Sequence, residues 1–221
     1  RPPCILAHAC GGCTLQHLSV EAQNRWKQDH LHATLHRIGG LTDLAAPLVS
    51  PEAQSLGYRN RALIPLQRLE GELRLGYYRR GSHRIVNLNH CPVLDPRLDA
   101  LIEPIKRDLS DTNWPIDSDL RGKPGLRHLG LRIGVRTGEL LISLVSATEH
   151  LPGLEQLAGQ WMQRWPALKG VTLNVQPKRS NTVLGAQTLC LQGQDVIEEY
   201  FCGLTLQLGT TTFFQVNTER A

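Results

Sequence analysis

Three cysteines lie within the first thirteen residues, and a fourth stands far along the chain. Cys4, Cys10 and Cys13 form the pattern C-x5-C-x2-C, with two glycines between the last pair, and Cys91 precedes a proline in the segment NHCPVL. Thiolates at this spacing suit a metal centre, because glycines let the backbone fold around the site and donate N–H groups to sulfur. A fold in which all four thiols meet must place its N-terminus beside residue 91.

Two kinds of metal centre are compatible with this pattern. Zinc takes four thiolates, or three thiolates and a histidine, and His8, His17 and His90 are near the cysteines in the sequence. Zinc sites more often use two C-x2-C pairs, however, and this chain has one. A tight trio followed by a distant Cys-Pro is the arrangement of many cubane iron–sulfur sites, so the spacing favours a cluster over zinc.

The rest of the sequence gives no sign of an oxidising compartment or a membrane. A disulfide framework needs an oxidising compartment, so we do not expect the cysteines to form one. The start RPPC has no apolar segment after a basic end, so we predict no secretion signal and expect a cytoplasmic protein. No apolar run reaches the roughly 18 residues of a membrane span. Cys190 and Cys202 lie in strand-like apolar runs, and we expect both to be buried free thiols.

Positive charge is concentrated in two blocks of a chain of 221 residues with a net charge of +4. Seven arginines lie between Tyr58 and Arg84, and five Lys or Arg residues without an acid lie between Arg121 and Arg136. Such blocks indicate a basic surface for a polyanion, most naturally nucleic acid. We therefore expect the segments 58–84 and 126–136 to form one basic face, with a solvated arginine-rich strand surface as the alternative.

Apolar periodicity and turn residues predict an α+β fold. The fold class is an antiparallel-sheet central domain with flanking helices and an N-terminal metal-binding loop. The expected helices are 18–38, capped by Ser19 and stopped by Gly39-Gly40, then 96–109 and 151–165. The expected strands are 61–69, 72–80 and 83–88, a hairpin over 126–146 that turns at Thr137-Gly138, and further strands from Gly170.

Several motifs together resemble a known family. The segments CILAHACGGCTLQHL, GYRNRALIPL, LRLGYYRRGSHRIVNLNHCPVL, GLRHLGLRIG and TTTFFQVN stand in the order found in RNA uracil-5-methyltransferases that carry an iron–sulfur cluster. The resemblance covers nearly the whole chain. It implies transfer of a methyl group from S-adenosylmethionine to C5 of a uridine in ribosomal or transfer RNA, by cysteine addition and general-base assistance, and we favour 23S ribosomal RNA over transfer RNA.

The resemblance also assigns roles to particular residues. It implies a [4Fe-4S] cluster on Cys4, Cys10, Cys13 and Cys91. It places Gln215 at the S-adenosylmethionine cofactor and Phe213 near the flipped base. It puts Arg59 and Arg61 at the RNA, although Leu63 stands where some members of the family have a further arginine.

Two motifs of the family are absent. The chain has neither the Ser-Cys-Asn-Pro segment of the catalytic cysteine nor the glycine loop of the cofactor pocket, and we interpret EEYFCGLTLQLG as a strand and a turn. The resemblance therefore implies a chain that lacks the C-terminal Rossmann-like methyltransferase domain, with the nucleophile beyond Ala221 and no catalytic residue of its own. The alternative is a non-catalytic RNA-binding module with a structural metal site.

This interpretation divides the chain into parts. Residues 1–15 and 49–209 form the central iron–sulfur and RNA-binding domain, and residues 16–48 form a helical segment that packs on the methyltransferase domain. Residues 210–221 begin that domain. We expect a monomer that is inactive by itself, with RNA and the missing domain as its partners.

Overall fold

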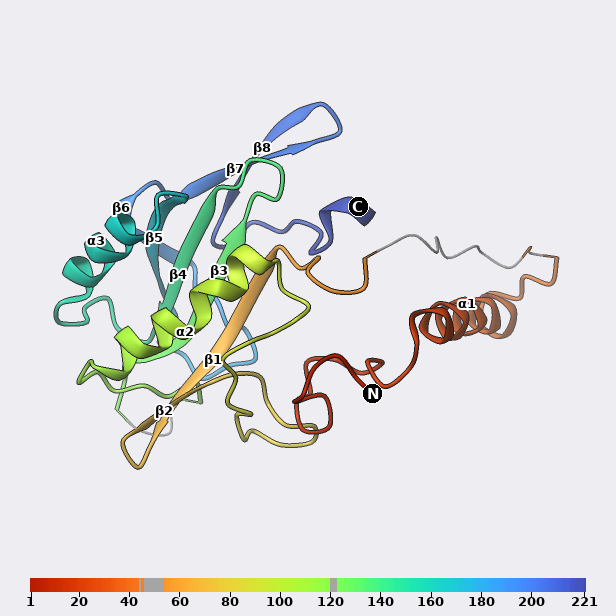
Figure 1. Cartoon of the computed structure of the whole chain (residues 1–221), viewed down its shortest axis with the longest axis horizontal. Helices are drawn as coiled ribbons and strands as arrows, with labels where there is room; N and C mark the ends of the chain where they lie inside the picture. The colour runs from red at the N-terminus through yellow and green to blue at the C-terminus, as the bar shows by residue number, and fades with distance from the viewer. Residues whose placement is uncertain (44, 46–53, 120–122) are drawn as a thin grey trace.

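A six-stranded sheet forms the centre of the part of the chain that the structure describes. The computed structural model describes every residue except 44, 46–53 and 120–122. Figure 1 shows α2 and α3 on one face of the sheet, while α1 stands apart from it. The helices are α1 (Val20–Arg37), α2 (Pro96–Ser110) and α3 (Leu154–Arg164), followed by a short 3-10 turn, η1 (Thr218–Arg220).

The sheet has the strand order β2-β1-β3-β4-β5-β6 and is mostly antiparallel. Its strands are β1 (Arg61–Leu69), β2 (Glu72–Leu75), β3 (Leu126–Ile133), β4 (Leu140–Ser146), β5 (Leu168–Val175) and β6 (Gln187–Gly193). The pair β4–β5 is parallel, because α3 carries the chain back along the sheet before β5 begins. The expected mixture of antiparallel sheet and flanking helices is confirmed, with this one parallel pair as a correction.

The first hairpin is shorter than its sequence suggests. Glu70 and Gly71 form its turn with φ angles of 50° and 84°, as a tight hairpin turn requires. β2 ends at Leu75, so the strand expected over 72–80 is confirmed only in its first four residues, and an irregular loop replaces the rest of it and the strand expected over 83–88. This loop is held by a bridge between Tyr78 and Ile85 and by the backbone hydrogen bond from Arg79 N to the carbonyl oxygen of Arg84, 2.8 Å long.

The main core lies between the sheet and α2 with α3. Asp95 caps α2 by accepting from Arg97 N at 2.9 Å, and Pro96 begins the helix. The apolar side chains of α2 at helical spacing are fully or almost fully buried, namely Leu98, Leu101, Ile102, Ile105 and Leu109. Burying each contributes roughly 1.5–3 kcal/mol. From α3, the buried Trp161 adds its ring and donates to Asp108 Oδ2 at 2.7 Å.

The opposite face of the sheet is covered by the C-terminal part of the chain. The strands β7 (Val196–Phe201) and β8 (Leu204–Gly209) form a separate antiparallel hairpin. Ile197 and Leu208 from this hairpin pack with Leu141 of β4 and with Phe214. The buried carboxylate of Glu199 accepts from the backbone N–H groups of residues 135, 136 and 200, so the hairpin is tied to the β3–β4 turn.

Strands β3 and β4 are therefore buried along their whole length. Arg127 and Arg132 are only 3% and 5% exposed, so the expectation that segment 126–136 supplies an exposed basic face is wrong for these two residues. Arg127 donates to the carbonyl oxygens of Gln176, Lys178 and Ser118. Strand alternation predicted two faces for β3, and both turn out to be covered.

Residues 210–218 lie on the sheet. The hydroxyl groups of Ser143, Thr172 and Thr210 form a buried triangle with oxygen–oxygen distances of 2.8–2.9 Å. The buried Asn60 amide donates to the carbonyl oxygen of Gln215 at 2.7 Å and to Thr218 Oγ1 at 2.9 Å. The assignment of 210–221 to a further domain stays a prediction, and the expected boundary between residues 48 and 49 lies outside the described residues.

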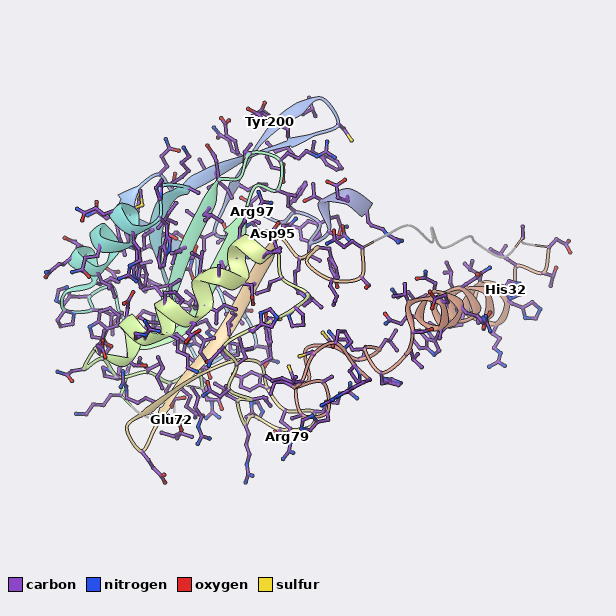
Figure 2. The ribbon with its side chains drawn as sticks, in the orientation of Figure 1. His32, Glu72, Arg79, Asp95, Arg97 and Tyr200 are labelled. Carbon is purple, nitrogen blue, oxygen red and sulfur yellow. The ribbon has the colours of Figure 1, made fainter. Side chains whose placement is uncertain are left out.

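Helix α1 projects from the body of the molecule. Ser19 caps it by accepting from Ala22 N at 3.3 Å, and Gly40 follows its end with a φ of 66°, as expected. None of its residues is buried, and Trp26 is 49% exposed and stacks on His30. Figure 2 shows His32 on this helix, far from the sheet. None of the described helices is both long and apolar enough to span a membrane.

His128 predicts a pH dependence of folding. It lies buried in β3, and burial lowers its pKa to about 3, with the Arg127 charge as a second cause. Below pH 6.5 the unfolded chain binds a proton at His128 that the folded chain excludes. The free energy of unfolding therefore decreases as pH falls. Between about pH 6.5 and 3, His128→Leu should reduce the slope of the unfolding free energy against pH by up to about 1.4 kcal/mol per pH unit.

Urea titrations at several pH values measure this slope. The exposed His32 supplies the control, because His32→Gln should leave the slope unchanged. An equal slope in wild type and His128→Leu would show that His128 takes up a proton in the folded state.

Asn60 predicts how firmly the C-terminal segment is held. Asn60→Ala removes the donors to Gln215 O and Thr218 Oγ1, so the free energy of unfolding should fall by about 1–3 kcal/mol. Asn89 is exposed and contacts Lys106 Nζ, so Asn89→Ala should change it by no more than about 0.5 kcal/mol. Chemical denaturation measures both variants, and equal losses would contradict the role given to Asn60.

Candidate functional site

The four cysteines singled out in the sequence line one cavity. Cys4, Cys10, Cys13 and Cys91 surround a space of about 210 Å³, together with Tyr77 and other side chains. The cavity lies between the N-terminal loop and the segment that leads into α2. The expectation that the N-terminus lies beside residue 91 is therefore confirmed.

Backbone pairing places the N-terminal loop. Gly11 N donates to the carbonyl oxygen of Tyr78 at 2.8 Å, and Cys10 forms an isolated bridge with Arg79. A Cβ atom on Gly11 would lie 2.7 Å from Tyr78 O, so this close approach requires glycine. Arg80 adds a hydrogen bond from Nη2 to the carbonyl oxygen of Cys13 at 2.8 Å. The irregular loop after β2 thus serves as the seat of the cysteine loop.

The other wall of the cavity is fixed by α2. The carboxylate of Asp99 accepts from Cys91 N at 2.6 Å and pairs with His90 Nδ1. Because Asp99 lies in the first turn of α2, the Cys91 thiol takes its position from the helix. His90 lines the cavity but is held by Asp99, whereas His8 and His17 do not line it.

The thiols influence one another electrostatically. Burial raises the pKa of Cys91 to about 11, with Cys13 and Cys4 as further causes, and burial also raises the pKa of Cys13, followed by Cys10 and Cys4. Two sulfurs accept hydrogen bonds of 3.4 Å, Cys10 Sγ from Gly12 N and Cys13 Sγ from the Gln16 amide. The cavity therefore combines four mutually interacting thiols with N–H donors to sulfur.

The arrangement of these groups bears equally on every kind of metal centre. Within the described ranges, no group of three or more His, Cys, Asp or Glu side chains is arranged to hold one metal ion. The described side chains as they stand therefore do not form a preassembled site for any metal centre, zinc or iron–sulfur cluster.

Arginine side chains of the first basic block have different surroundings. Arg59 lines the cysteine cavity, and its Nε donates to the carbonyl oxygen of Arg61 at 3.1 Å. Arg61 instead donates to Thr210 O at 2.9 Å. Arg68 holds the carbonyl groups at the C-terminal end of α2. Among the exposed members, Arg79 is seen in Figure 2 on the loop beside the N-terminal segment.

The two residues expected at the cofactor and the base are both exposed. The Phe213 ring is 78% exposed, and Gln215 is exposed as well, while its carbonyl oxygen is held by Asn60. Between them Phe214 turns inward and packs edge-on against Phe201, with ring centroids 5.4 Å apart. The segment therefore presents Phe213 and Gln215 outward from a fixed backbone.

The expectation of buried thiols at Cys190 and Cys202 is wrong, because both are exposed. Cys190 lies on β6, which is the edge strand of the sheet. Cys202 occupies the β7–β8 turn with a φ of 49°, followed by Gly203 at 77°, so the strand-and-turn interpretation of this segment is confirmed. Neither residue lines the cysteine cavity.

A second cavity beside the C-terminal segment was not predicted from the sequence. A cavity of about 880 Å³ lies there, lined by Tyr58, Asn217 and the N-terminal end of α2. Asp95 and Arg97 face it as an ion pair with a 2.8 Å N–O distance, seen in Figure 2. The motif GYRNR contained a signal for it, because Tyr58 belongs to that motif.

No known protein-family model matches the chain. The sequence is similar to proteins described as uncharacterized RNA methyltransferases, with 60% identity to one from Parasynechococcus marenigrum and 46% to one from Synechocystis, each over 100% of this chain. One from Bacillus cereus is 33% identical over 98% of it. The chain spans about half the length of the curated relatives it matches, 47–48% in these three.

The fold is similar to a solved structure. The crystal structure of Pyrococcus abyssi tRNA (uracil-54, C5)-methyltransferase in complex with S-adenosyl-L-homocysteine matches with a TM-score of 0.70 and 25% identity. The match covers 98% of this chain and 49% of that chain. Nearly all of the present fold is thus similar to about half of a longer RNA-modifying enzyme.

Proposed function

We propose that this chain is part of a longer S-adenosylmethionine-dependent RNA methyltransferase that methylates C5 of a uridine. The observation that carries the proposal is the fold match over 98% of the chain to a tRNA (uracil-54, C5)-methyltransferase solved with S-adenosyl-L-homocysteine. The similarity to RNA methyltransferases of about twice the length supports it independently. A cytoplasmic location fits the free thiols.

In the proposed reaction S-adenosylmethionine supplies the methyl group. A cysteine thiolate from outside this chain adds to C6 of the uracil, and after methyl transfer to C5 a base removes the C5 proton so that the thiolate is eliminated. The uracil must leave its stack to be reached. The exposed Phe213 ring offers it an apolar surface, and Gln215, which is exposed on the same fixed segment, contacts the cofactor in this proposal.

Arg59 and Arg61 are proposed to face the RNA, in a role that carries no sequence information because guanidinium groups bind phosphate oxygens. We propose 23S ribosomal RNA as the substrate, with transfer RNA as the competing outcome of the test below. A non-catalytic RNA-binding module remains the second outcome.

We further propose that Cys4, Cys10, Cys13 and Cys91 hold a [4Fe-4S] cluster. The shared cavity, the all-thiol donor set and the N–H donors to Cys10 and Cys13 support this assignment. Bound iron would keep the thiols deprotonated and tie the N-terminal loop to the segment that leads into α2. Asp99 orients Cys91, and Arg80 fixes the backbone at Cys13.

Catalysis is tested with labelled S-adenosylmethionine. The full-length protein that carries this chain should label undermethylated 23S ribosomal RNA at uridine C5, whereas residues 1–221 alone should label neither ribosomal nor transfer RNA. Gln215→Ala in the full-length protein should weaken cofactor binding or turnover, and Cys202→Ala at the exposed turn should leave both unchanged. Labelling of transfer RNA alone would show that transfer RNA, and not 23S ribosomal RNA, is the substrate. Binding without labelling of any RNA would refute the enzymatic proposal.

The metal is tested by anaerobic purification. The protein should be brown and contain about four irons per chain. Cys91→Ser should lose the iron and lower the stability of the fold by several kcal/mol, about 4 by the loop-closure argument. Cys190→Ser is the matched control at an exposed thiol and should keep full iron content. A colourless protein with one zinc per chain would rule out the cluster.

A further inference from the structure

Two arginines on neighbouring strands are paired in the sheet without an anionic partner. Arg61 of β1 and Arg132 of β3 occupy directly opposed positions in the register. Both guanidinium groups donate only to backbone carbonyls, Arg61 to Thr210 O at 2.9 Å and to Thr212 O at 3.5 Å, and Arg132 to Thr212 O. Among the residues that the structure describes, no carboxylate forms an ion pair with either.

Arg132 also has an unsatisfied donor. The side chain is 5% exposed, and its Nη1 atom is buried without a hydrogen-bond partner. Burial, followed by the charge of Arg61, lowers the pKa of Arg132 to about 10. A buried charge beside a like charge is strongly unfavourable unless an opposite charge compensates it.

Arg127 shows that a buried arginine in the same strand can have all of its guanidinium nitrogens hydrogen-bonded. Its guanidinium is 3% exposed, and all three of its nitrogens donate to carbonyl oxygens. Arg127 also has no second arginine opposite it. The missing anion is therefore a property of the Arg61–Arg132 pair.

The pair lies next to the exposed aromatic ring of the C-terminal segment. Both guanidiniums hold the carbonyl of Thr212, and the next residue, Phe213, exposes 78% of its surface. A paired cation site adjoining an exposed ring has the two elements with which proteins bind a nucleotide, namely a phosphate site and a stacking surface. Arg61 is only half-buried, so the pair is open to solvent on that side.

We propose that Arg61 and Arg132 form a two-guanidinium clamp for one backbone phosphate of the RNA strand, with the adjoining base stacked on Phe213. Guanidinium forks bind phosphate oxygens in pairs, and the phosphate takes the unpartnered Nη1 group of Arg132 and the N–H groups of Arg61 that hold no carbonyl, so that residues 210 and 212 keep their contacts. Arg132 is thus a positioning residue for the strand. This inference rests on the proposed function, because it takes RNA as the ligand.

The first experiment measures thermal unfolding of the 221-residue chain with inorganic phosphate, acetate or chloride at equal ionic strength. Phosphate should raise the Tm of the wild type by a few degrees more than acetate does. In Arg132→Met this difference should vanish, whereas the Tm without phosphate should not fall, because the variant removes an uncompensated buried charge. A fall in that Tm with the phosphate response retained would make Arg132 a structural residue and overturn the clamp.

The second experiment measures binding of a single-stranded oligouridylate at several salt concentrations. Arg132→Met should bind about tenfold more weakly, and the slope of log affinity against log salt should become less steep by about 0.7. Arg61→Met, at a half-buried position, should give the same change in affinity and salt dependence. The matched control is Arg127→Met, which should lower the Tm but leave the salt slope unchanged. Equal slopes in all four proteins would overturn the proposal.

These binding experiments separate the inference from the proposed function. If the full-length protein labels no RNA but the slope still depends on Arg132, the methyltransferase proposal fails and the clamp stands. If the full-length protein labels uridine and Arg132→Met binds RNA as the wild type does, the clamp alone fails. A response to acetate as large as that to phosphate would assign the pair to a carboxylate and refute the phosphate clamp.

Discussion

Strands β3 and β4 are covered on both faces, and this double burial governs how the rest of the chain is arranged. Helices α2 and α3 cover one face with apolar side chains, and the β7–β8 hairpin with residues 209–218 covers the other. A polar side chain on a strand buried in this way must find its partners inside the protein. The carbonyls of the covering segment provide such partners, as Arg61 and Arg132 show at Thr210 and Thr212.

The same burial explains how one short segment can present two side chains in defined directions. The hydroxyl triangle at Thr210 and the amide of Asn60 fix the backbone on either side of Phe213 and Gln215. These two residues therefore face outward from a backbone that the sheet holds in place. Positioning by a rigid support is what the proposed function requires of Phe213 and Gln215.

The cysteine cavity is built by a different principle. Its thiols come from two segments that are not paired with each other in a regular sheet. They meet because the N-terminal loop pairs with the irregular loop after β2. Asp99 then ties Cys91 to the first turn of α2. The cavity thus links the N-terminus, the irregular loop after β2 and helix α2, and the proposed cluster would cross-link these three parts.

Local chemistry determined much of this protein from the sequence alone. Ser19 and Gly39-Gly40 delimit α1, the Glu70-Gly71 pair makes the hairpin turn, and the Cys4–Cys91 pattern predicted that distant thiols meet. These features depend on neighbours in the chain or on a cysteine spacing that is typical of metal centres. The β7–β8 turn at Cys202-Gly203 was likewise predictable, because a positive φ at such a turn favours glycine.

Only the tertiary structure decided what the arginines do. Alternation along β3 assigns Arg127 and Arg132 to its two faces, but it does not say which segment covers each face. Residues more than 70 positions away supply that cover for Arg132, so its burial and its unsatisfied Nη1 cannot be read from local pattern. The exposure of Cys190 has the same origin, because α3 and the core contact the face of the edge strand β6 that carries Leu189 and Leu191, and Cys190 alternates to its other face.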